Sequence, residues 1–389
     1  MRPKILAYYF PSWHHDKRNT EWFGSHWDEW TLVEAARPRF EGHRQPRVPL
    51  DGRFDEATPE EAEKQIALAR EFGVDGFLVD YYWYDDGPYL SRGLDKGLLK
   101  ASNSGDVEIA IMWANHELVD IFPFEPGGSG DAALLKSGAI GLEAFQAMAH
   151  HVIESYFPLS NYLRVDGKPW FSIYEIGNLV AGLGSVEAAR SALEWFEAET
   201  IAAGFPGLHL DALIWGVAVL PAAVVLDDPQ SLLEDLSISS ATSYVWVHHT
   251  QTTEHDFPAA SVERLQEDAF AEYESYAESL DIPFYPNVTV GWDSTPRLGD
   301  GVSFESGPYP RFPVWDQNPE QFKAGLSRAK AFLEDHPTDS PIVTVNAWNE
   351  WTEGSYLLPD TTHGTAFLEA IRDVFPPESA QLTTGEGAN

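Results

Sequence analysis

The stretch PIVTVNAWNEWTEGSYLLPD, residues 341–360, joins a short apolar run to a group of indoles and carboxylates. Residues 341–345 are apolar or β-branched throughout, which is typical of a parallel strand covered on both faces. Glu350 and Glu353 follow three residues apart, with tryptophans close by. Charged and aromatic groups placed where a buried strand ends indicate a fold in which strand ends meet and form a site.

Seven further runs of this kind precede that stretch. The eight strand candidates are 4–10, 75–83, 108–115, 169–175, 210–217, 238–246, 283–292 and 341–348. Helical patterns lie at 58–73, 89–103, 139–156, 185–203, 228–236, 259–280, 317–335 and 362–374. Eight strand–helix units in sequence predict a closed α/β fold, a (β/α)8 TIM barrel, rather than a doubly wound sheet. We expect a single (β/α)8 catalytic domain over 1–375 and a polar, frayed tail over 376–389.

Two connections are much longer than the others. Residues 11–58 follow the first strand candidate, and residues 116–138 follow the third. Long loops at the top of a barrel usually build or cover the functional site. We therefore expect both loops beside the site.

The composition narrows the classes of partner. The formal net charge is −36, which argues against binding to nucleic acid or to an anionic membrane surface. There are no cysteines, so disulfides and thiolate metal sites are excluded, and redox chemistry does not reveal the compartment. As written, the sequence indicates a cytoplasmic protein, or a secreted or periplasmic one if a signal peptide was removed. Nothing in it indicates the oligomeric state.

Polar and aromatic residues stand at the end of every strand candidate, where a barrel places its active site. Indoles and phenols offer flat apolar faces, and carboxylates and amides bind hydroxyls, so together they suit a carbohydrate. The predicted substrate-binding residues are Tyr8, Tyr82, Trp83, Trp113, Asn115, Glu117, Tyr174, Glu175, Trp215, Tyr244, Trp292, Asn346, Trp348 and Asn349.

The paired glutamates suit glycosidic cleavage, which needs one group to protonate the leaving oxygen and another to support the anomeric centre. Two close carboxylates push their pKa values apart, so one keeps a proton near neutrality. Glu350 and Glu353 share a face if the chain turns helically after the strand. From the spacing alone, one of them could equally be a solvated loop residue or a helix cap.

Other charged residues leave alternatives open. His14, His15, His43 and His116 could hold a metal, but their spacing is not diagnostic, and we expect neither metal nor cofactor. Arg44 and Arg47 could bind a carboxylate or sulfate of a substrate, or could only lock their loop.

Several blocks together resemble one known family, the WbsX-type, glycoside hydrolase family 99-like proteins. The blocks are AYYFPSWH, WDEWTLVEAARPRFEGHRQPRVPL, DGFLVDYYWY, IMWAN, YLRVDGKPWFSIYE, NAWNEWTEGSYLLPD and HGTAFLEAI, in that order. The resemblance spans about residues 5 to 374 and implies a (β/α)8 barrel, in agreement with the strand count.

The resemblance also implies an activity. Family 99 enzymes are endo-acting α-mannosidases and α-mannanases that retain configuration. Glu350 matches the family residue that acts as a base on the sugar 2-hydroxyl, and Glu353 matches the general acid, later general base. The route implied runs through a 1,2-anhydro sugar, with no enzyme nucleophile, unlike the usual two-carboxylate retaining scheme.

The sequence departs from the family pattern at two places. Thr352 stands between the glutamates, where family 99 proper tends to carry His and the WbsX-like group Ala. After IMWAN the chain has HELVDIFPFEPGG instead of a run rich in Trp and Arg. Some WbsX-like proteins are labelled glycosyltransferases, so a glycosyltransferase of polysaccharide biosynthesis and a noncatalytic glycan-binding barrel remain the alternatives.

Overall fold

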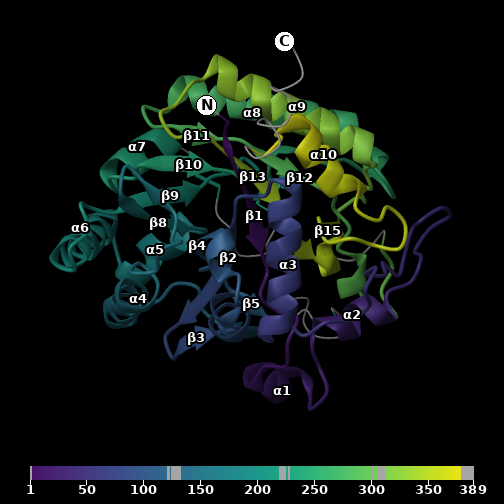
Figure 1. Ribbon diagram of the computed structural model, residues 1–389, viewed down its shortest axis with the longest axis horizontal. Coiled ribbons are helices and arrows are strands. Elements are labelled where there is room, and N and C mark those ends of the chain that lie inside the picture. Colours follow the sequence, from purple (N-terminus) through teal and green to yellow (C-terminus); the bar gives the residue numbers. More distant parts are fainter. Residues whose placement is uncertain are drawn as a thin grey trace, which may run out of the picture.

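The computed structural model describes residues 2–120, 123, 133–218, 225–226, 228–299, 301–304 and 312–377. Parallel strands stand at the centre of the molecule, and helices surround them (Figure 1). The main sheet runs in the order β11-β10-β9-β8-β4-β2-β1-β13-β12. These strands are β1 (Lys4–Tyr9), β2 (Gly76–Tyr84), β4 (Glu108–Trp113), β8 (Lys168–Ile173), β9 (His209–Leu213), β10 (Ser240–Thr242), β11 (Phe284–Tyr285), β12 (Asn287–Thr289) and β13 (Ile342–Asn346).

The two outermost strands of that order close the barrel. β11 pairs with β10, and β12 pairs with β13, both in parallel. Only Pro286 separates β11 from β12, and proline has no N–H to continue a ladder. The two short strands are therefore the halves of the seventh predicted strand. The eight strand candidates and the predicted TIM barrel are confirmed.

Seven of the predicted helices are present. They are α3 (Pro59–Phe72), α4 (Leu142–Ser155), α6 (Val186–Ala202), α7 (Pro229–Asp235), α8 (Val262–Ser279), α9 (Pro319–Asp335) and α10 (Ala366–Val374). α3 has the ends that its sequence predicted, with Thr58 as N-cap, proline in the first turn and Gly73 in the left-handed conformation. An additional helix that was not predicted, α5 (Ile176–Leu183), begins directly after β8.

The helix predicted for residues 89–103 is wrong. This segment forms a π-turn, Gly93–Gly97, and a 3₁₀ turn, Leu98–Lys100. Its glycines lie against Glu56, and a Cβ at Gly97 would stand 2.0 Å from the Glu56 carbonyl oxygen. The close approach of this backbone to the loop after β1 replaces a regular helix.

Both long loops carry structure of their own. The loop after β1 forms α1 (Lys17–Phe23) and α2 (Glu29–Ala35), which lie beyond one end of α3 (Figure 1). The loop after β4 forms a small hairpin of β5 (Leu118–Val119) and β6 (Leu134–Lys136). Two more short strands, β3 (Gly87–Tyr89) and β7 (Arg164–Val165), pair with β2 and β8 in antiparallel orientation.

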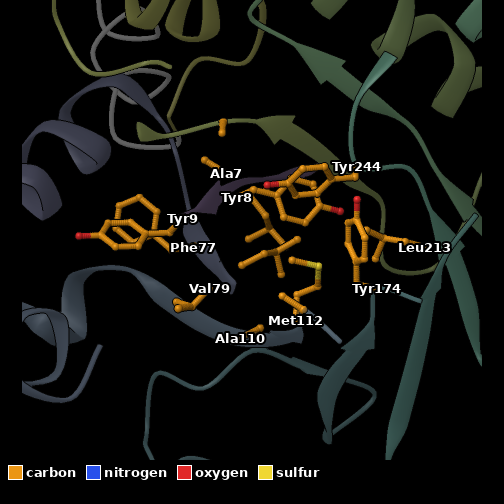
Figure 2. Packing of buried hydrophobic residues seen from close by; sticks show 14 of the residues in the cluster. Ala7, Tyr8, Tyr9, Phe77, Val79, Ala110, Met112, Tyr174, Leu213 and Tyr244 are labelled. Atoms are coloured by element: carbon orange, nitrogen blue, oxygen red, sulfur yellow. The ribbon is translucent and has the colours of Figure 1, made fainter. Parts of the chain in front are cut away.

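In the core, successive residues of one strand contact different parts of the molecule. Side chains alternate along a strand, so Tyr8 of β1 points into the barrel and Tyr9 points out (Figure 2). Tyr8 packs on Tyr244, with ring centroids 4.7 Å apart, and Tyr9 packs on Phe77 at 5.3 Å. The inward face thus builds the floor below the strand ends, while the outward face holds the helices.

The C-terminal helix α10 packs on α9, where the rings of Phe322 and Phe367 are 5.6 Å apart. The domain end at residue 375 stays a prediction, and most of the predicted tail, 378–389, lies outside the described residues. Within the described ranges, no helix combines the length and the apolar character needed to cross a membrane.

Candidate active site at the mouth of the barrel

A cavity lies at the carboxyl ends of the strands, and residues at or just after the ends of β2, β4 and β8 and in the hairpin after β13 line it. It has a volume of about 940 Å³, counting the space open to solvent. Aromatic side chains form much of its wall, namely Phe10, Phe23, Trp27, Tyr82, Tyr89, Tyr174, Tyr244 and Trp292. Its charged and imidazole groups are Glu29, Asp80, His116, Glu117, His248, Arg297, Glu350 and Glu353.

The two predicted catalytic glutamates sit on one tight hairpin after β13. Strand β14 (Asn349–Glu350) pairs with β15 (Ser355–Tyr356), and one 3₁₀ turn, Trp351–Glu353, joins them. Gly354 closes the turn with φ +64°, a left-handed conformation that glycine adopts without strain. This single helical turn brings both carboxyl groups to the same cavity, as the spacing of three residues predicted.

Arg297, from the 3₁₀ turn Thr295–Arg297 after β12, bridges the pair. Its Nη2 donates to Glu350 Oε1 at 3.0 Å, and its Nη1 donates to Glu353 Oε1. Thr352, the residue between the glutamates, donates its hydroxyl to Glu350 Oε1 at 3.0 Å. All four side chains are buried. One guanidinium thus fixes the orientation of two carboxyl groups, because its planar donors reach both.

Burial raises the pKa of both glutamates, and the Arg297 charge lowers both against that trend. Glu353 raises the pKa of Glu350 further, as do Glu29 and Asp80. Two carboxyl groups that interact this strongly do not ionise together, so the pair retains a proton near neutrality. The surrounding protein charges favour that proton on Glu350.

Two more carboxyl groups border the pair. Asp80, at the end of β2, accepts a hydrogen bond from Tyr244 through Oδ2 at 3.0 Å, and burial raises its pKa well above the ordinary value. Glu29, at the start of α2, is 3% exposed, and burial raises its pKa to about 7. Helix α2 contacts the turns that carry Arg297 and Glu353, which brings Glu29 to the site from a segment far away in sequence.

The histidines do not come together. His14 pairs with Glu56 at 2.9 Å and His43 with Asp293 at 2.8 Å, while His116 bonds the Glu117 carbonyl. Burial lowers the pKa of His116, so it is a neutral imidazole at the cavity wall. In the part of the chain that the structure describes, no three His, Asp or Glu side chains are arranged to hold a metal ion.

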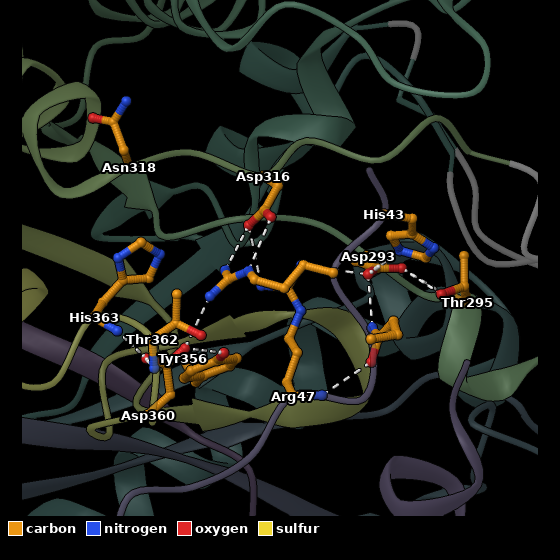
Figure 3. A network of polar contacts seen from close by, with 12 residues as sticks. His43, Arg47, Asp293, Thr295, Asp316, Asn318, Tyr356, Asp360, Thr362 and His363 are labelled. Atoms are coloured by element: carbon orange, nitrogen blue, oxygen red, sulfur yellow. Dashed lines mark hydrogen bonds and ion pairs between the residues drawn. The ribbon is translucent and has the colours of Figure 1, made fainter. Parts of the chain in front are cut away.

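Arg44 and Arg47 are engaged in a polar network behind the hairpin (Figure 3). Arg44 pairs with Asp316 at 2.8 Å and with Asp360 at 3.1 Å. Arg47 pairs with Asp293 at 3.3 Å and with Asp316 at 3.1 Å. Of the two readings of these arginines, the structure favours the one in which they lock their loop.

The network reaches the turn Trp351–Glu353 through Asp293. Its carboxylate accepts hydrogen bonds from Gln45 and Thr295, each at 2.7 Å, and its pKa is held well below the usual range by His43 and Arg47 despite burial. Its backbone N–H donates to the Glu353 carbonyl oxygen. The loop after β1 is therefore tied to the backbone that carries Glu353.

Seven of the predicted site residues line the cavity: Tyr82, Glu117, Tyr174, Tyr244, Trp292, Glu350 and Glu353. The structure does not bring the other nine to its wall: Tyr8, Trp83, Trp113, Asn115, Glu175, Trp215, Asn346, Trp348 and Asn349.

Strand alternation and loop bonding account for three of these positions. Trp348 points outward and donates its indole N–H to Gln65 of α3 at 2.9 Å, while the Trp113 ring lies 5.9 Å from Phe145 of α4. Asn349 bonds both backbone groups of Phe10 and so holds the loop after β1. A ligand-binding role for these nine residues stays a prediction.

Arg297 and Glu29 are among the cavity residues that the sequence analysis missed. Arg297 stands alone in a loop after the seventh strand, and no pattern marks it as the partner of a pair 53 and 56 residues away. Glu29 lies between Trp27 and Trp30 in the first long loop. Its place in WDEW, an acid among indoles, was the one signal that could have found it.

The chain is similar in sequence to one known protein family and to curated relatives. The family model described as glycosyltransferase WbsX matches residues 5–371. The uncharacterized protein WxcX of Xanthomonas campestris pv. campestris is 27% identical over 374 residues, which are 95% of this chain and 49% of that protein. The chain thus spans about half the length of the curated relatives it matches.

Solved structures share its fold. A glycoside hydrolase-like protein superimposes with a TM-score of 0.63 at 12% identity, covering 96% of this chain and 94% of that one. The family 99 endo-α-mannosidase of Bacteroides thetaiotaomicron superimposes with a TM-score of 0.57 at 14% identity, covering 99% and 98%. At such identities the likeness concerns the fold, a barrel shared with glycoside hydrolases. The match over nearly the whole chain shows that this protein belongs to the WbsX family, which is glycoside hydrolase family 99-like in fold.

Proposed function

We propose that this chain is a glycoside hydrolase that cleaves an α-linked, mannose-like polysaccharide or oligosaccharide with retention of configuration. The observation that carries the proposal is the buried pair Glu350 and Glu353, held by Arg297 at the wall of an aromatic cavity. The fold shared with a family 99 endo-α-mannosidase supports it. Aromatic faces beside carboxyl groups are the surfaces that sugar rings and hydroxyls need.

The proposed reaction uses the pair in opposite protonation states. Glu350 acts as the carboxylate and Glu353 as the carboxylic acid, although the protein charges favour the proton on Glu350. A sugar 2-hydroxyl that donates a hydrogen bond to Glu350 stabilises its carboxylate form and lowers its pKa. The proton then resides on Glu353, which faces the leaving oxygen.

The first step forms an anhydro sugar. Glu350 takes the proton of the 2-hydroxyl as O2 attacks C1, the bond from C1 to the leaving oxygen breaks, and Glu353 gives its proton to that oxygen. In the second step Glu353, now a carboxylate, takes a proton from the attacking water. The C1–O2 bond breaks, and O2 regains its proton from Glu350. Two inversions at C1 give net retention.

The family description keeps a second candidate in view, a glycosyltransferase of polysaccharide biosynthesis. A nucleotide-sugar donor would bring a diphosphate to a cavity whose described wall holds five carboxyl groups and one guanidinium. Phosphates are usually bound by helix N-termini or several cations, so this charge balance favours hydrolysis. A noncatalytic glycan-binding barrel, the third candidate, would have no use for a proton-sharing pair.

The test is digestion of α-linked mannan and mannose-oligosaccharide panels, with products followed by mass spectrometry and anomeric NMR. We expect cleavage with retention by the wild type, and a fall of about 10²–10⁴-fold in Glu350→Gln and in Glu353→Gln. Glu278→Gln, which removes an exposed acid of α8, serves as the control. Undiminished cleavage in both glutamine variants would refute the assignment, and saturable binding of a nucleotide sugar would favour transfer.

A further inference from the structure

Acidic groups outnumber basic groups among the described residues that line the cavity. Glu29, Asp80, Glu350 and Glu353 line the same cavity, and the other three raise the pKa of Glu350 beyond the effect of its burial. Glu117 adds a fifth at the wall. Arg297 is the one guanidinium or ammonium group among the described lining residues, and it already spans Glu350 and Glu353.

Two of these carboxyl groups have oxygens that no described donor serves. Oδ1 of Asp80 and Oε2 of Glu29 are buried and accept no hydrogen bond from the described residues. Asp80 is 2% exposed and Glu29 3%, and both line the cavity. A buried carboxyl oxygen without a donor is costly, so these two atoms call for a donor from a ligand.

Two arginines of the loop after β1 form ion pairs away from the cavity. Arg44 and Arg47 pair with Asp316, Asp360 and Asp293 behind the hairpin. Burial lowers the pKa of His116 and His248, which therefore bring no positive charge to the wall. An anionic ligand would be repelled by whichever of these carboxyl groups ionise, whereas a cationic one would stabilise their carboxylate forms.

We propose that this cavity binds a sugar that carries a protonated amino group more tightly than the uncharged sugar, and that it rejects uronic acids and sulfated sugars. The ammonium group donates to one of the two unsatisfied oxygens of the wall, Asp80 Oδ1 or Glu29 Oε2. The inference rests on the proposed function only in placing a sugar in the cavity. Because O2 is the reacting group, the amine stands on a carbon other than C2.

Three small polyols of similar size test the charge preference without knowledge of the sugar. They are the Tris cation, uncharged pentaerythritol and the anion 2,2-bis(hydroxymethyl)propionate, each titrated at pH 7 in phosphate buffer and followed by ligand-observed NMR. We expect Tris to bind at least about tenfold more tightly than pentaerythritol. The anion should show no saturable binding. Equal binding of Tris and pentaerythritol, or stronger binding of the anion, overturns the proposal.

Substitutions then test which side chains cause the preference for the cation. We test Asp80→Asn and Glu29→Gln separately and expect the ratio of Tris to pentaerythritol affinity to fall at least about threefold in one or both of them. Glu278→Gln removes one charge from the acidic surface and should leave the ratio unchanged. A ratio that is the same in all three variants would assign the amine to the surface and refute the site. Circular dichroism checks folding, and the wild-type ranking stands without the variants.

Failure of this inference is separable from failure of the proposed function. Cleavage of neutral glycans without a preference for Tris refutes only the charge selection. A clear Tris preference in a protein that cleaves no glycan refutes only the hydrolase. Where both hold, α-linked oligosaccharides with a free amine at C3, C4 or C6 should be cleaved with a lower KM than their neutral counterparts.

Discussion

Replacing Glu29 with glutamine should stabilise the protein at alkaline pH but not at acidic pH. Burial raises the folded-state pKa of Glu29 from 4.5 to about 7. Between these values the folded state binds more protons than the unfolded state, so this group makes stability fall as pH rises. Each unit of pKa shift corresponds to about 1.4 kcal/mol, so the penalty at pH 8 is about 3 kcal/mol.

Glutamine has nearly the same shape and no charge, so it removes that penalty. We expect the variant minus wild-type difference in unfolding free energy to be near zero at pH 4.5 and about 3 kcal/mol in favour of the variant at pH 8. The assay is urea unfolding, followed by tryptophan fluorescence, at several pH values. Glu278→Gln, an exposed position, is the control and should show a flat difference. A flat difference for Glu29→Gln, or one that grows towards acid, would refute the buried, proton-holding carboxyl.

Three further substitutions test the contacts that hold the turn Trp351–Glu353. Arg297→Met leaves two buried carboxyl groups without their shared cation. It should cost about 3–5 kcal/mol in urea unfolding at pH 8 and less at pH 5, because protonation of the carboxyl groups in acid removes the charge that Arg297 balances; an equal cost at both pH values contradicts this. Asp293→Asn removes one of the two carboxylates that pair with the buried Arg47. Because the folded-state pKa of Asp293 is depressed, its contribution is present at neutral pH and lost in acid. The free energy of unfolding of this variant should therefore be about 3–5 kcal/mol lower than that of the wild type at pH 7, and the difference should shrink as the pH falls. Gly354→Ala places a Cβ 2.8 Å from the Cβ of Asp293 at φ +64°. It should cost more than about 1–2 kcal/mol in stability and lower kcat, whereas Gly364→Ala, at φ +56° with open space around it, should cost only the backbone strain and leave kcat unchanged.

The fold could be predicted from the sequence because the patterns that indicate its strands and helices are local. Each strand candidate is a short run of apolar residues, and the alternation of such runs with amphipathic stretches specifies a parallel barrel. The division of the seventh strand at Pro286 was missed, since periodicity does not show which residue of a run leaves the ladder. The helix predicted at 89–103 is absent because this backbone lies close to Glu56, and a local sequence pattern does not contain that contact.

The candidate site was accessible only in part. Glu350 and Glu353 follow a strand, and their spacing places both on one turn, so the sequence was sufficient to predict that they share a cavity. Trp113 and Trp348 also stand near strand ends, but their side chains face the helices. Residue type and distance from a strand end do not decide which face a side chain takes when the strand boundary is uncertain by one residue.

The sequence by itself determined the barrel, the position of the mouth and the presence of two carboxyl groups on one turn, because these follow from short-range periodicity. Only the tertiary structure decided what surrounds them. Arg297 and Glu29 reach the pair from loops after the seventh and the first strand, through contacts that no local rule encodes. The protonation of the pair depends on those contacts, since burial and neighbouring charge set a pKa and both are properties of the folded chain.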